Sequence, residues 1–270
     1  MTGSMAGVRA EPNMIDRILA PGGLRVMLQP IVDTTGPLTT VHSYECLSRG
    51  PLGTNMESAD ILFEYIRRKK AEQPLDRACI EAGLEAGSRL PGLPRFAVNV
   101  HAITIATDPD FPAFLKHASS SRGISTSRLT VEIVEHAPTW HEDGFLETLV
   151  LLRQLGIKIA LDDVGLGHSN YKMILESDPD YLKIDRFFVT NCQNDRKRRA
   201  VIQSILELAR QFEASVVAEG VESREEFQWL FDNGVELFQG YYFSRPLAVE
   251  ALTEGTWQRS LAGRPREASA

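Results

Sequence analysis

The sequence has few cysteines, no long apolar run and no signal-peptide pattern. Its three cysteines are widely spaced and form no C-x-x-C pair, which argues against a disulfide framework or a cysteine zinc site. No stretch approaches the ~20 apolar residues of a membrane-spanning helix. The N-terminal stretch MTGSMAGVRAEPNMI holds no apolar core of signal-peptide length. We therefore expect a cytoplasmic protein with no membrane partner.

Positive charge is also scarce. The chain has 29 lysines and arginines against 36 acidic residues, a net charge of −7. A protein that coats nucleic acid is usually basic, so we expect no nucleic-acid polymer as a partner, although a small anionic ligand held through bound cations is compatible with this charge. A Walker A loop, G-x-S-x-G and H-E-x-x-H are absent as well, and these absences argue against several common enzyme classes.

What the sequence does contain is an alternation of strand-like runs and amphipathic stretches. Runs such as RFAVNV and KIAL are nearly continuous apolar segments, typical of parallel strands buried on both faces. This alternation predicts an α/β fold, and a (β/α)8 TIM-like barrel is the simplest form of it. A doubly wound open sheet is the competitor, but no G-x-G-x-x-G follows the first strand. The expected strands are 25–31, 40–47, 95–100, 128–134, 158–161, 181–184, 215–218 and 236–242, and the expected helices are 59–68, 74–89, 143–155, 196–212 and 224–233.

No low-complexity linker divides the chain. Its two ends are small, polar and without periodicity. We expect one barrel domain at 14–255, between a flexible N-terminal tail at 1–13 and a flexible C-terminal tail at 256–270.

Polar residues recur where the expected strands end, which in a (β/α)8 barrel is where the chemistry lies. Clustered carboxylates repel one another and take up protons unless a cation shares the site. Their oxygen atoms suit Mg²⁺ or Mn²⁺, and two such ions can clamp a water and a phosphate oxygen. The pattern therefore predicts metal-assisted phosphoester hydrolysis, with Lys183 steadying the water or the developing charge. The residues are Glu45, Arg49, Asn99, Glu132, Glu135, Asp162, Asp163, Lys183, Asp185, Glu219, Glu222 and Gln239.

Seven stretches, in order, resemble the EAL domain, a bacterial phosphodiesterase module that hydrolyses cyclic di-GMP to linear pGpG. The resemblance covers about residues 14 to 255. It implies a barrel whose first strand is antiparallel to the rest, one or two Mg²⁺ or Mn²⁺ ions as cofactor, and a homodimer. Ca²⁺, with its looser geometry, is expected to bind without supporting turnover. The stretches are YECLSRG (44–50), FAVNV (96–100), LTVEIVE (129–135), LDDVGLGHSN (161–170), YLKID (181–185), AEGVE (218–222) and FQGYYFSRP (238–246).

The resemblance also implies a role for each matching position. Lys183 is similar to the lysine that holds or deprotonates the catalytic water, and Gln239 to a glutamine near that water. Glu222 is similar to a glutamate that steadies the loop after the fifth strand. The implied metal ligands are Glu45, Asn99, Glu132, Asp162, Asp163, Asp185 and Glu219. The implied catalytic residues are Glu45, Lys183, Asp163, Glu219 and Gln239, and the implied substrate contacts are Gln29, Arg49, Leu47 and Glu222.

The chain departs from the family pattern in three places. Cys46 replaces the alanine of E-A-L, and His101 replaces a serine. The loop at 162–170 keeps both aspartates but changes several neighbours, which we expect to affect rate and coupling to dimerisation. We interpret His101 and His168 as ordinary hydrogen-bonded histidines. Two alternatives to an enzyme stay open: a module that binds cyclic di-GMP without hydrolysing it, and a protein-interaction domain that has lost the nucleotide.

Overall fold

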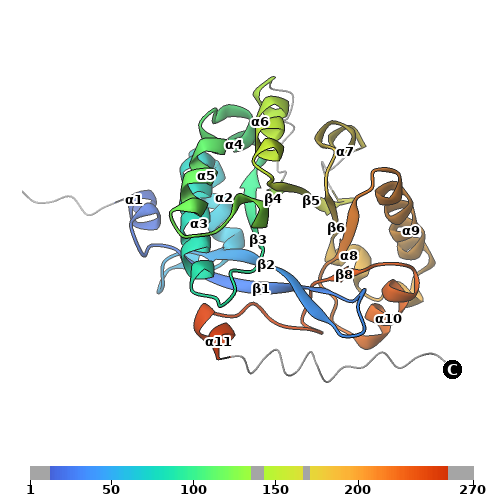
Figure 1. Cartoon of the computed structure of the whole chain (residues 1–270). Coiled ribbons are helices and arrows are strands. Elements are labelled where there is room, and N and C mark those ends of the chain that lie inside the picture. The colour runs from blue at the N-terminus through green and yellow to red at the C-terminus, as the bar shows by residue number, and fades with distance from the viewer. Residues whose placement is uncertain (1–12, 135–142, 167–170, 255–270) are drawn as a thin grey trace, which may run out of the picture.

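The computed structural model describes residues 13–134, 143–166 and 171–254. Eight strands close into a barrel in chain order, with helices packed around it (Figure 1). The expected eight-stranded α/β barrel is confirmed, and the open sheet is wrong. The expected tails, apart from Asn13, lie outside the described residues, as do Glu135 and His168.

The first strand runs against its neighbours. β1 pairs antiparallel with both β2 and β8, while every pairing from β2 to β8 is parallel. The carboxyl ends of seven strands therefore meet at one rim of the barrel. The strands are β1 (Arg25–Asp33), β2 (Thr40–Arg49), β3 (Phe96–His101), β4 (Leu129–Val134), β5 (Lys158–Val164), β6 (Tyr181–Ile184), β7 (Ser215–Ala218) and β8 (Leu237–Phe238).

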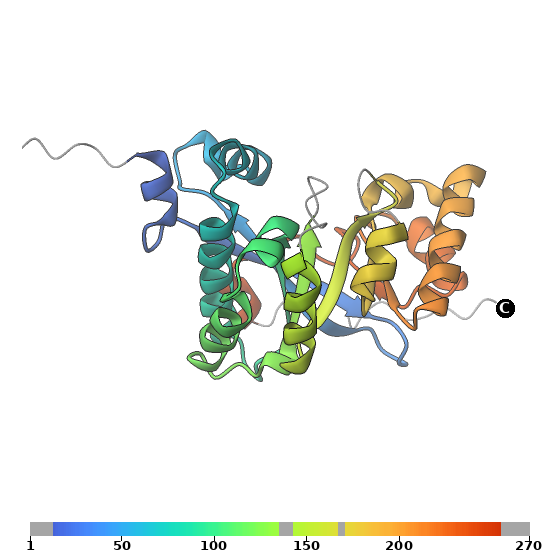
Figure 2. The same cartoon turned by 90° about the horizontal axis from the view of Figure 1, so that it is seen from above.

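The five expected helices are present within one or two residues of their expected bounds. Seen from above, the helices up to Gln154 lie on one side of the barrel and those between Tyr171 and Asp232 on the other (Figure 2). These five are α2 (Ala59–Lys69), α3 (Glu72–Ser88), α6 (Asp143–Gln154), α9 (Arg196–Gln211) and α10 (Arg224–Asp232). Six more were not expected: α1 (Met14–Leu19), α4 (Ala102–Thr107), α5 (Phe111–Ser120), α7 (Tyr171–Ser177), α8 (Arg186–Val189) and α11 (Val249–Thr253).

Helix starts in the second half are capped by side chains. Asp185 accepts from the Phe187 backbone N–H at 2.6 Å and begins α8. Ser223 and Glu226 form a capping box at α10, which satisfies backbone donors that the first turn leaves without partners. The short segments after β6 and β7 are thereby fixed close to the barrel rim.

The apolar core lies mainly between the strands and the surrounding helices. Phe96, Val98 and Val100 alternate along β3 and are almost completely buried, as a strand with one face against helices requires. A separate cluster joins α1 to α2 and the start of α3, and contains Ile18, Met56, Leu62, Ile66, Ala71, Leu75 and Cys79. In the described residues, no helix is both long and apolar enough to cross a membrane.

The last strand is much shorter than the expected 236–242. Only Leu237 and Phe238 pair as a strand, and the chain turns away after Gln239. Gly240 explains the turn, since it packs so closely against the 221 backbone that a Cβ at this position would lie 2.1 Å from the Val221 carbonyl oxygen. Only glycine tolerates such an approach.

Candidate functional site

Lys183 lies at the centre of the barrel rim. β6 directs its side chain inward, where it is 1% exposed. Its Nζ lies 2.6 Å from a Glu132 oxygen and 2.6 Å from a Glu219 oxygen. Oxygens of Asp162 and Glu45 follow at 3.1 and 3.7 Å. One ammonium is therefore shared by four carboxylates from four different strands or strand ends.

Amide side chains hold Glu45 in a single orientation. Asn99 Nδ2 donates to Glu45 Oε1 at 2.8 Å, and Gln239 Nε2 donates to Glu45 Oε2 at 2.7 Å. Gln239 Nε2 also lies 3.2 Å from Gln29 Oε1, and Gln29 Nε2 donates to the Ser244 carbonyl at 3.1 Å. These bonds join β1, β2, β3 and the segment after β8, so the orientation of Glu45 depends on the closed barrel.

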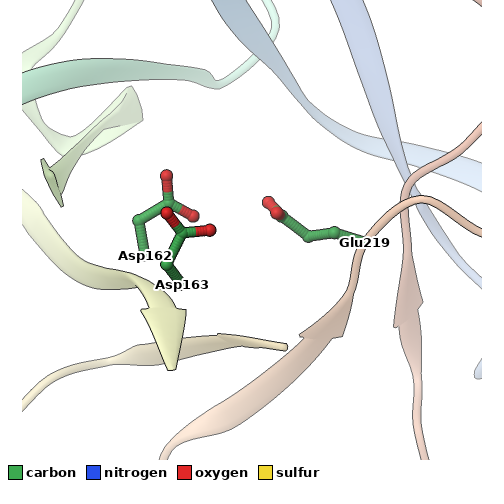
Figure 3. Close-up of side chains that lie close together, drawn as sticks. All are labelled: Asp162, Asp163 and Glu219. Carbon is green, nitrogen blue, oxygen red and sulfur yellow. The ribbon is translucent and has the colours of Figure 1, made fainter. Parts of the chain in front are cut away.

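Two of the four carboxylates around Lys183, Asp162 and Glu219, also form a group with Asp163. Figure 3 shows the two aspartates rising from one strand and the glutamate facing them from another. Oxygen atoms of all three lie within 4.8 Å of one another. Sequence analysis placed both aspartates after a strand ending at 161, but β5 continues to Val164. Its pairing with β6 is irregular between Leu161 and Val164, and Asp163 has a φ of 51°. This left-handed conformation is rare for non-glycine residues and turns adjacent carboxylates toward one site.

Burial and mutual repulsion raise the pKa values of several of these carboxyl groups. Burial, with Glu45 and Asp162 nearby, raises the pKa of Glu132 to about 8 despite Lys183. Burial, Asp162 and Asp185 raise the pKa of Asp163 to about 7. The pKa of Glu219 lies well above its ordinary value for the same reasons. The cluster therefore carries more negative charge than one lysine neutralises.

The pKa values of Glu45 and Lys183 shift in the directions that keep both side chains charged. Burial alone would raise the pKa of Glu45, but Lys183 and the donors of Asn99 and Gln239 outweigh it and hold the pKa below its usual value. Burial would likewise lower the pKa of Lys183, yet the surrounding carboxylates raise it well above normal. Lys183 is therefore a fixed ammonium in this arrangement.

This donor set fits a divalent cation such as Mg²⁺ or Mn²⁺. It is made of carboxylate and amide oxygens, which hard cations prefer. The raised pKa values of Glu132, Asp163 and Glu219 show that the carboxylates compete for positive charge. A bound cation would supply that charge in place of protons.

Three of the sequence-predicted residues lie away from the centre. Asp185 caps α8, and its carboxyl group also helps to raise the pKa of Asp163. Glu222 pairs with Arg186 at 2.9 Å and its side chain is 44% exposed. Arg49 donates to the Ser48 carbonyl at 2.8 Å. All three are peripheral to the carboxylates around Lys183.

Two cavities flank the carboxylates and share Glu45, Leu47 and Asp162. One, of about 270 Å³, is also lined by Gln29, Glu222 and Gln239. The other, of about 180 Å³, extends between the barrel and the pair α2 and α3, and Arg49 lies on its wall. A ligand that reaches the carboxylates therefore has room on both sides of them.

Sequence reasoning missed two residues of the larger cavity, Arg186 and Tyr241. The Arg245 guanidinium lies 4.2 Å from the centre of the Tyr241 ring. Arg186 directly follows the KID stretch, which is the one signal that could have identified it. Tyr241 was missed because it lies within the strand expected at 236–242, whereas in the structure the chain has already turned away from the barrel there.

The family departures at Cys46 and His101 line the smaller cavity. Cys46 is buried against Gly83, where an added Cβ would lie 3.0 Å from the Cys46 Cβ. Burial and the nearby Glu45 and Glu132 raise the pKa of the Cys46 thiol, so it is no activated nucleophile. His101 Nδ1 lies 2.7 Å from Asp76 Oδ1, in agreement with the interpretation of a hydrogen-bonded histidine. His168 lies outside the described residues.

The closed barrel and its carboxylate-and-lysine cluster define an α/β-barrel protein with a polar site at the carboxyl rim of its strands. The chain belongs to the EAL domain family, whose model matches residues 13–246. The cyclic di-GMP phosphodiesterase NbdA of Pseudomonas aeruginosa is 35% identical over 140 residues, which are 52% of this chain and 18% of NbdA. The blue light- and temperature-regulated antirepressor BluF of Escherichia coli is 30% identical over 162 residues, 60% of this chain and 39% of BluF. The chain thus spans well under half the length of either relative.

Solved structures share the fold. Klebsiella pneumoniae BlrP1 in a calcium and cyclic di-GMP complex is 28% identical with a TM-score of 0.75, over 88% of this chain and 58% of BlrP1. A manganese and cyclic di-GMP complex of BlrP1 gives 29% identity and a TM-score of 0.74, over 83% and 56% of the two chains. Both BlrP1 complexes therefore share the barrel fold of this chain.

Proposed function

We propose that this chain is a phosphodiesterase that hydrolyses cyclic di-GMP to linear pGpG with Mg²⁺ or Mn²⁺. The observation that carries the proposal is the sharing of one buried ammonium, Lys183, by four carboxylates beside the Asp162, Asp163 and Glu219 group. Family membership and the phosphodiesterase among the relatives support the substrate. Cyclic di-GMP is also the nucleotide in the BlrP1 complexes.

In this proposal the chain's own residues bind and orient the reactants. Glu45, Asn99, Glu132 and Asp162 would hold a first cation, and Asp163, Asp185 and Glu219 a second. When bound, the cation polarises the phosphate and lowers the pKa of water. Lys183, fixed between Glu132 and Glu219, donates from Nζ to orient the attacking water, with Gln239 beside it.

The two flanking cavities would receive the two halves of the substrate. Gln29, Leu47 and Glu222 line the larger cavity and Arg49 the smaller one. Arg49 presents a fork of donors suited to a phosphate. The scissile phosphodiester would then lie at Glu45 and Asp162, which both cavities share.

Metal dependence tests the proposal directly. Purified protein is incubated with cyclic di-GMP and either Mg²⁺, Mn²⁺ or Ca²⁺, and the nucleotides are separated by chromatography. We expect linear pGpG with Mg²⁺ and Mn²⁺ and none with Ca²⁺, because calcium's looser coordination holds substrate without aligning it. Unchanged nucleotide with every metal would contradict the proposed enzyme.

A second candidate is a receptor that binds cyclic di-GMP without hydrolysing it. The altered loop at 162–170 and the antirepressor BluF among the relatives favour it. Calorimetric titration with cyclic di-GMP distinguishes this receptor from a domain that has lost the nucleotide. Binding without turnover would support the receptor. Absence of binding would support the protein-interaction domain.

We also propose a homodimer that forms through α6 and α7. These helices follow β4 and β5, which carry Glu132 and the two aspartates. Among their exposed apolar side chains, Leu146 and Val150 are four residues apart, as are Tyr171 and Leu175, which places each of these two pairs on one face of a helix. Such a concentration of exposed apolar residues is typical of an interface. They are Leu146 (45% exposed), Val150 (51%), Leu151 (45%), Tyr171 (77%) and Leu175 (68%).

Replacing Leu175 with glutamate is expected to convert the dimer to a monomer, because the new charge would be buried without a partner. Light scattering after size exclusion gives the mass directly, against 30.0 kDa for one chain. Leu52→Glu is the matched control, since Leu52 is similarly exposed, at 63%, on a different surface. A Leu175→Glu variant with the parent's dimeric mass would rule out this interface.

A further inference from the structure

One buried carboxylate joins the start of α3 to the end of β3. Asp76 is 1% exposed. Its Oδ1 lies 2.7 Å from His101 Nδ1, and its Oδ2 accepts from the His101 backbone N–H at 3.0 Å and from Thr104 Oγ1 at 2.5 Å. The side chain and the backbone of His101 are thus held by the same group.

We propose that Asp76 and His101 form a positioning pair that fixes Asn99, and through it Glu45, in the orientation that binds a divalent cation. Neither residue contacts the reacting atoms in this assignment, and both act through Asn99. The inference rests on the metal-dependent function proposed above. It goes further by assigning a purpose to the histidine that stands where the family has serine.

The end of β3 carries both Asn99 and His101. Asn99 and His101 are two residues apart on this strand, so both side chains project from the same face. β3 ends at His101, which forms the last pair with β4 opposite Val134. α4 begins at the next residue. His101 is the N-cap residue of α4, yet its side chain makes no capping hydrogen bond. That side chain is directed to Asp76 instead.

The contact of Asn99 with Glu45 depends on the orientation of this strand end. Its Nδ2 donates to Glu45 Oε1 at 2.8 Å, which leaves the amide oxygen as its only group able to bind a cation. A small rotation of the strand end would change both the bond to Glu45 and the direction of that oxygen. Groups that orient metal ligands without touching the metal typically change metal affinity 10- to 100-fold when replaced.

The histidine side chain contacts residues of two helices. Its ring lies 5.7 Å, centre to centre, from the Phe63 ring on α2, while Nδ1 is held by Asp76 on α3. His101 therefore links β3 to two helices at once. A serine hydroxyl lies one bond from Cβ and has no ring to pack on Phe63, so it could not make both contacts.

The test compares two replacements of His101 whose amide nitrogens lie at different distances from the backbone. In His101→Asn the amide nitrogen takes the place of Nδ1 and can still donate to Asp76. In His101→Gln it lies further out, at the distance of Nε2. Mn²⁺ affinity is measured by electron paramagnetic resonance without nucleotide, so the readout does not depend on turnover. We expect His101→Asn to stay within about threefold of the parent and His101→Gln and His101→Ala to bind Mn²⁺ about tenfold more weakly.

Thr104→Val is the matched control, because it removes a donor to the same carboxylate without touching β3. It should lower the melting temperature while leaving Mn²⁺ affinity unchanged. Kinetics with Mn²⁺ add a second readout, in which His101→Gln should lower kcat at saturating cyclic di-GMP and limiting metal, and excess metal should restore it.

The outcomes separate this inference from the proposed function. No Mn²⁺ binding by the parent protein would overturn the metal site itself, and this inference with it. Parent binding with equal affinities in His101→Asn and His101→Gln would overturn the positioning pair alone. The same holds if His101→Gln loses thermal stability but keeps the parent's Mn²⁺ affinity. If His101→Gln does not fold, Asp76→Asn gives the same comparison, with unchanged affinity counting against the pair.

Discussion

Replacing Glu45 with alanine is expected to reduce hydrolysis of cyclic di-GMP by about 10³-fold, the upper range for loss of one group that stabilises charge in a transition state. Glu45 is the acceptor of both Asn99 and Gln239 and lies 3.7 Å from Lys183. The substitution removes a proposed cation ligand and the acceptor that the half-buried Asn99 and the buried Gln239 share. The measurement is kcat at saturating Mg²⁺ and substrate.

Glu57→Ala provides the control for the Glu45 variant. Glu57 also pairs with a basic residue, Arg25, at 3.1 Å, but its side chain is 40% exposed and lies outside the cluster. We expect this control to keep the parent's kcat. Hydrolysis by Glu45→Ala at the parent rate would show that the metal site has been assigned wrongly.

Replacing Lys183 with alanine is expected to reduce turnover much more than nucleotide affinity. Its Nζ is directed at carboxylates in the centre of the barrel rim, whereas Arg49 and most of the cavity walls remain unchanged. Kinetics and calorimetric titration with cyclic di-GMP and Ca²⁺ give the two losses separately. Equal losses in kcat and in affinity would contradict the role assigned to Lys183.

The same variant should be destabilised, because Glu132 and Glu219 lose the one cation that they share. Removing one partner of a buried ion pair typically costs about 3–5 kcal/mol. Urea unfolding without metal measures the loss, and added Mg²⁺ should restore part of it by binding the folded state. Lys158→Ala is the control, since Lys158 pairs with Asp180 at 2.6 Å but is 54% exposed. A pair at the surface contributes about 1 kcal/mol or less.

The sequence predicted the barrel well because several of its buried strands are nearly continuous apolar runs and its long helices are periodic. Segments too short to show a period were missed, such as α4, α7 and α8. The antiparallel first strand came from family resemblance, since periodicity carries no information on strand direction. The length of β8 was wrong because the close approach of Gly240 to the 221 backbone depends on a segment distant in the sequence.

The candidate site was predicted in composition but not in arrangement. Strand ends gave Glu45, Asn99, Glu132, Asp162, Lys183 and Glu219, and the structure brings these together. The sequence did not indicate that Lys183 would lie at the centre of the carboxylates, or that Asp163 would adopt a left-handed conformation. The contact of His101 with Asp76 was also hidden, because α3 and β3 meet only after folding.

The joint between β1 and β8, which closes the barrel, has a consequence for when the candidate site is assembled during folding. Two residue pairs join β1 to β8, Val32 with Phe238 and Asp33 with Leu237, and a separate bridge joins Leu28 of β1 to Leu247. They join opposite ends of the chain, and such distant contacts carry a large entropic cost that local contacts do not. Gln239 reaches Glu45 and Gln29 only once this joint has closed. We therefore expect the joint to form late in folding, so that an incompletely folded chain cannot assemble the site that would consume the messenger.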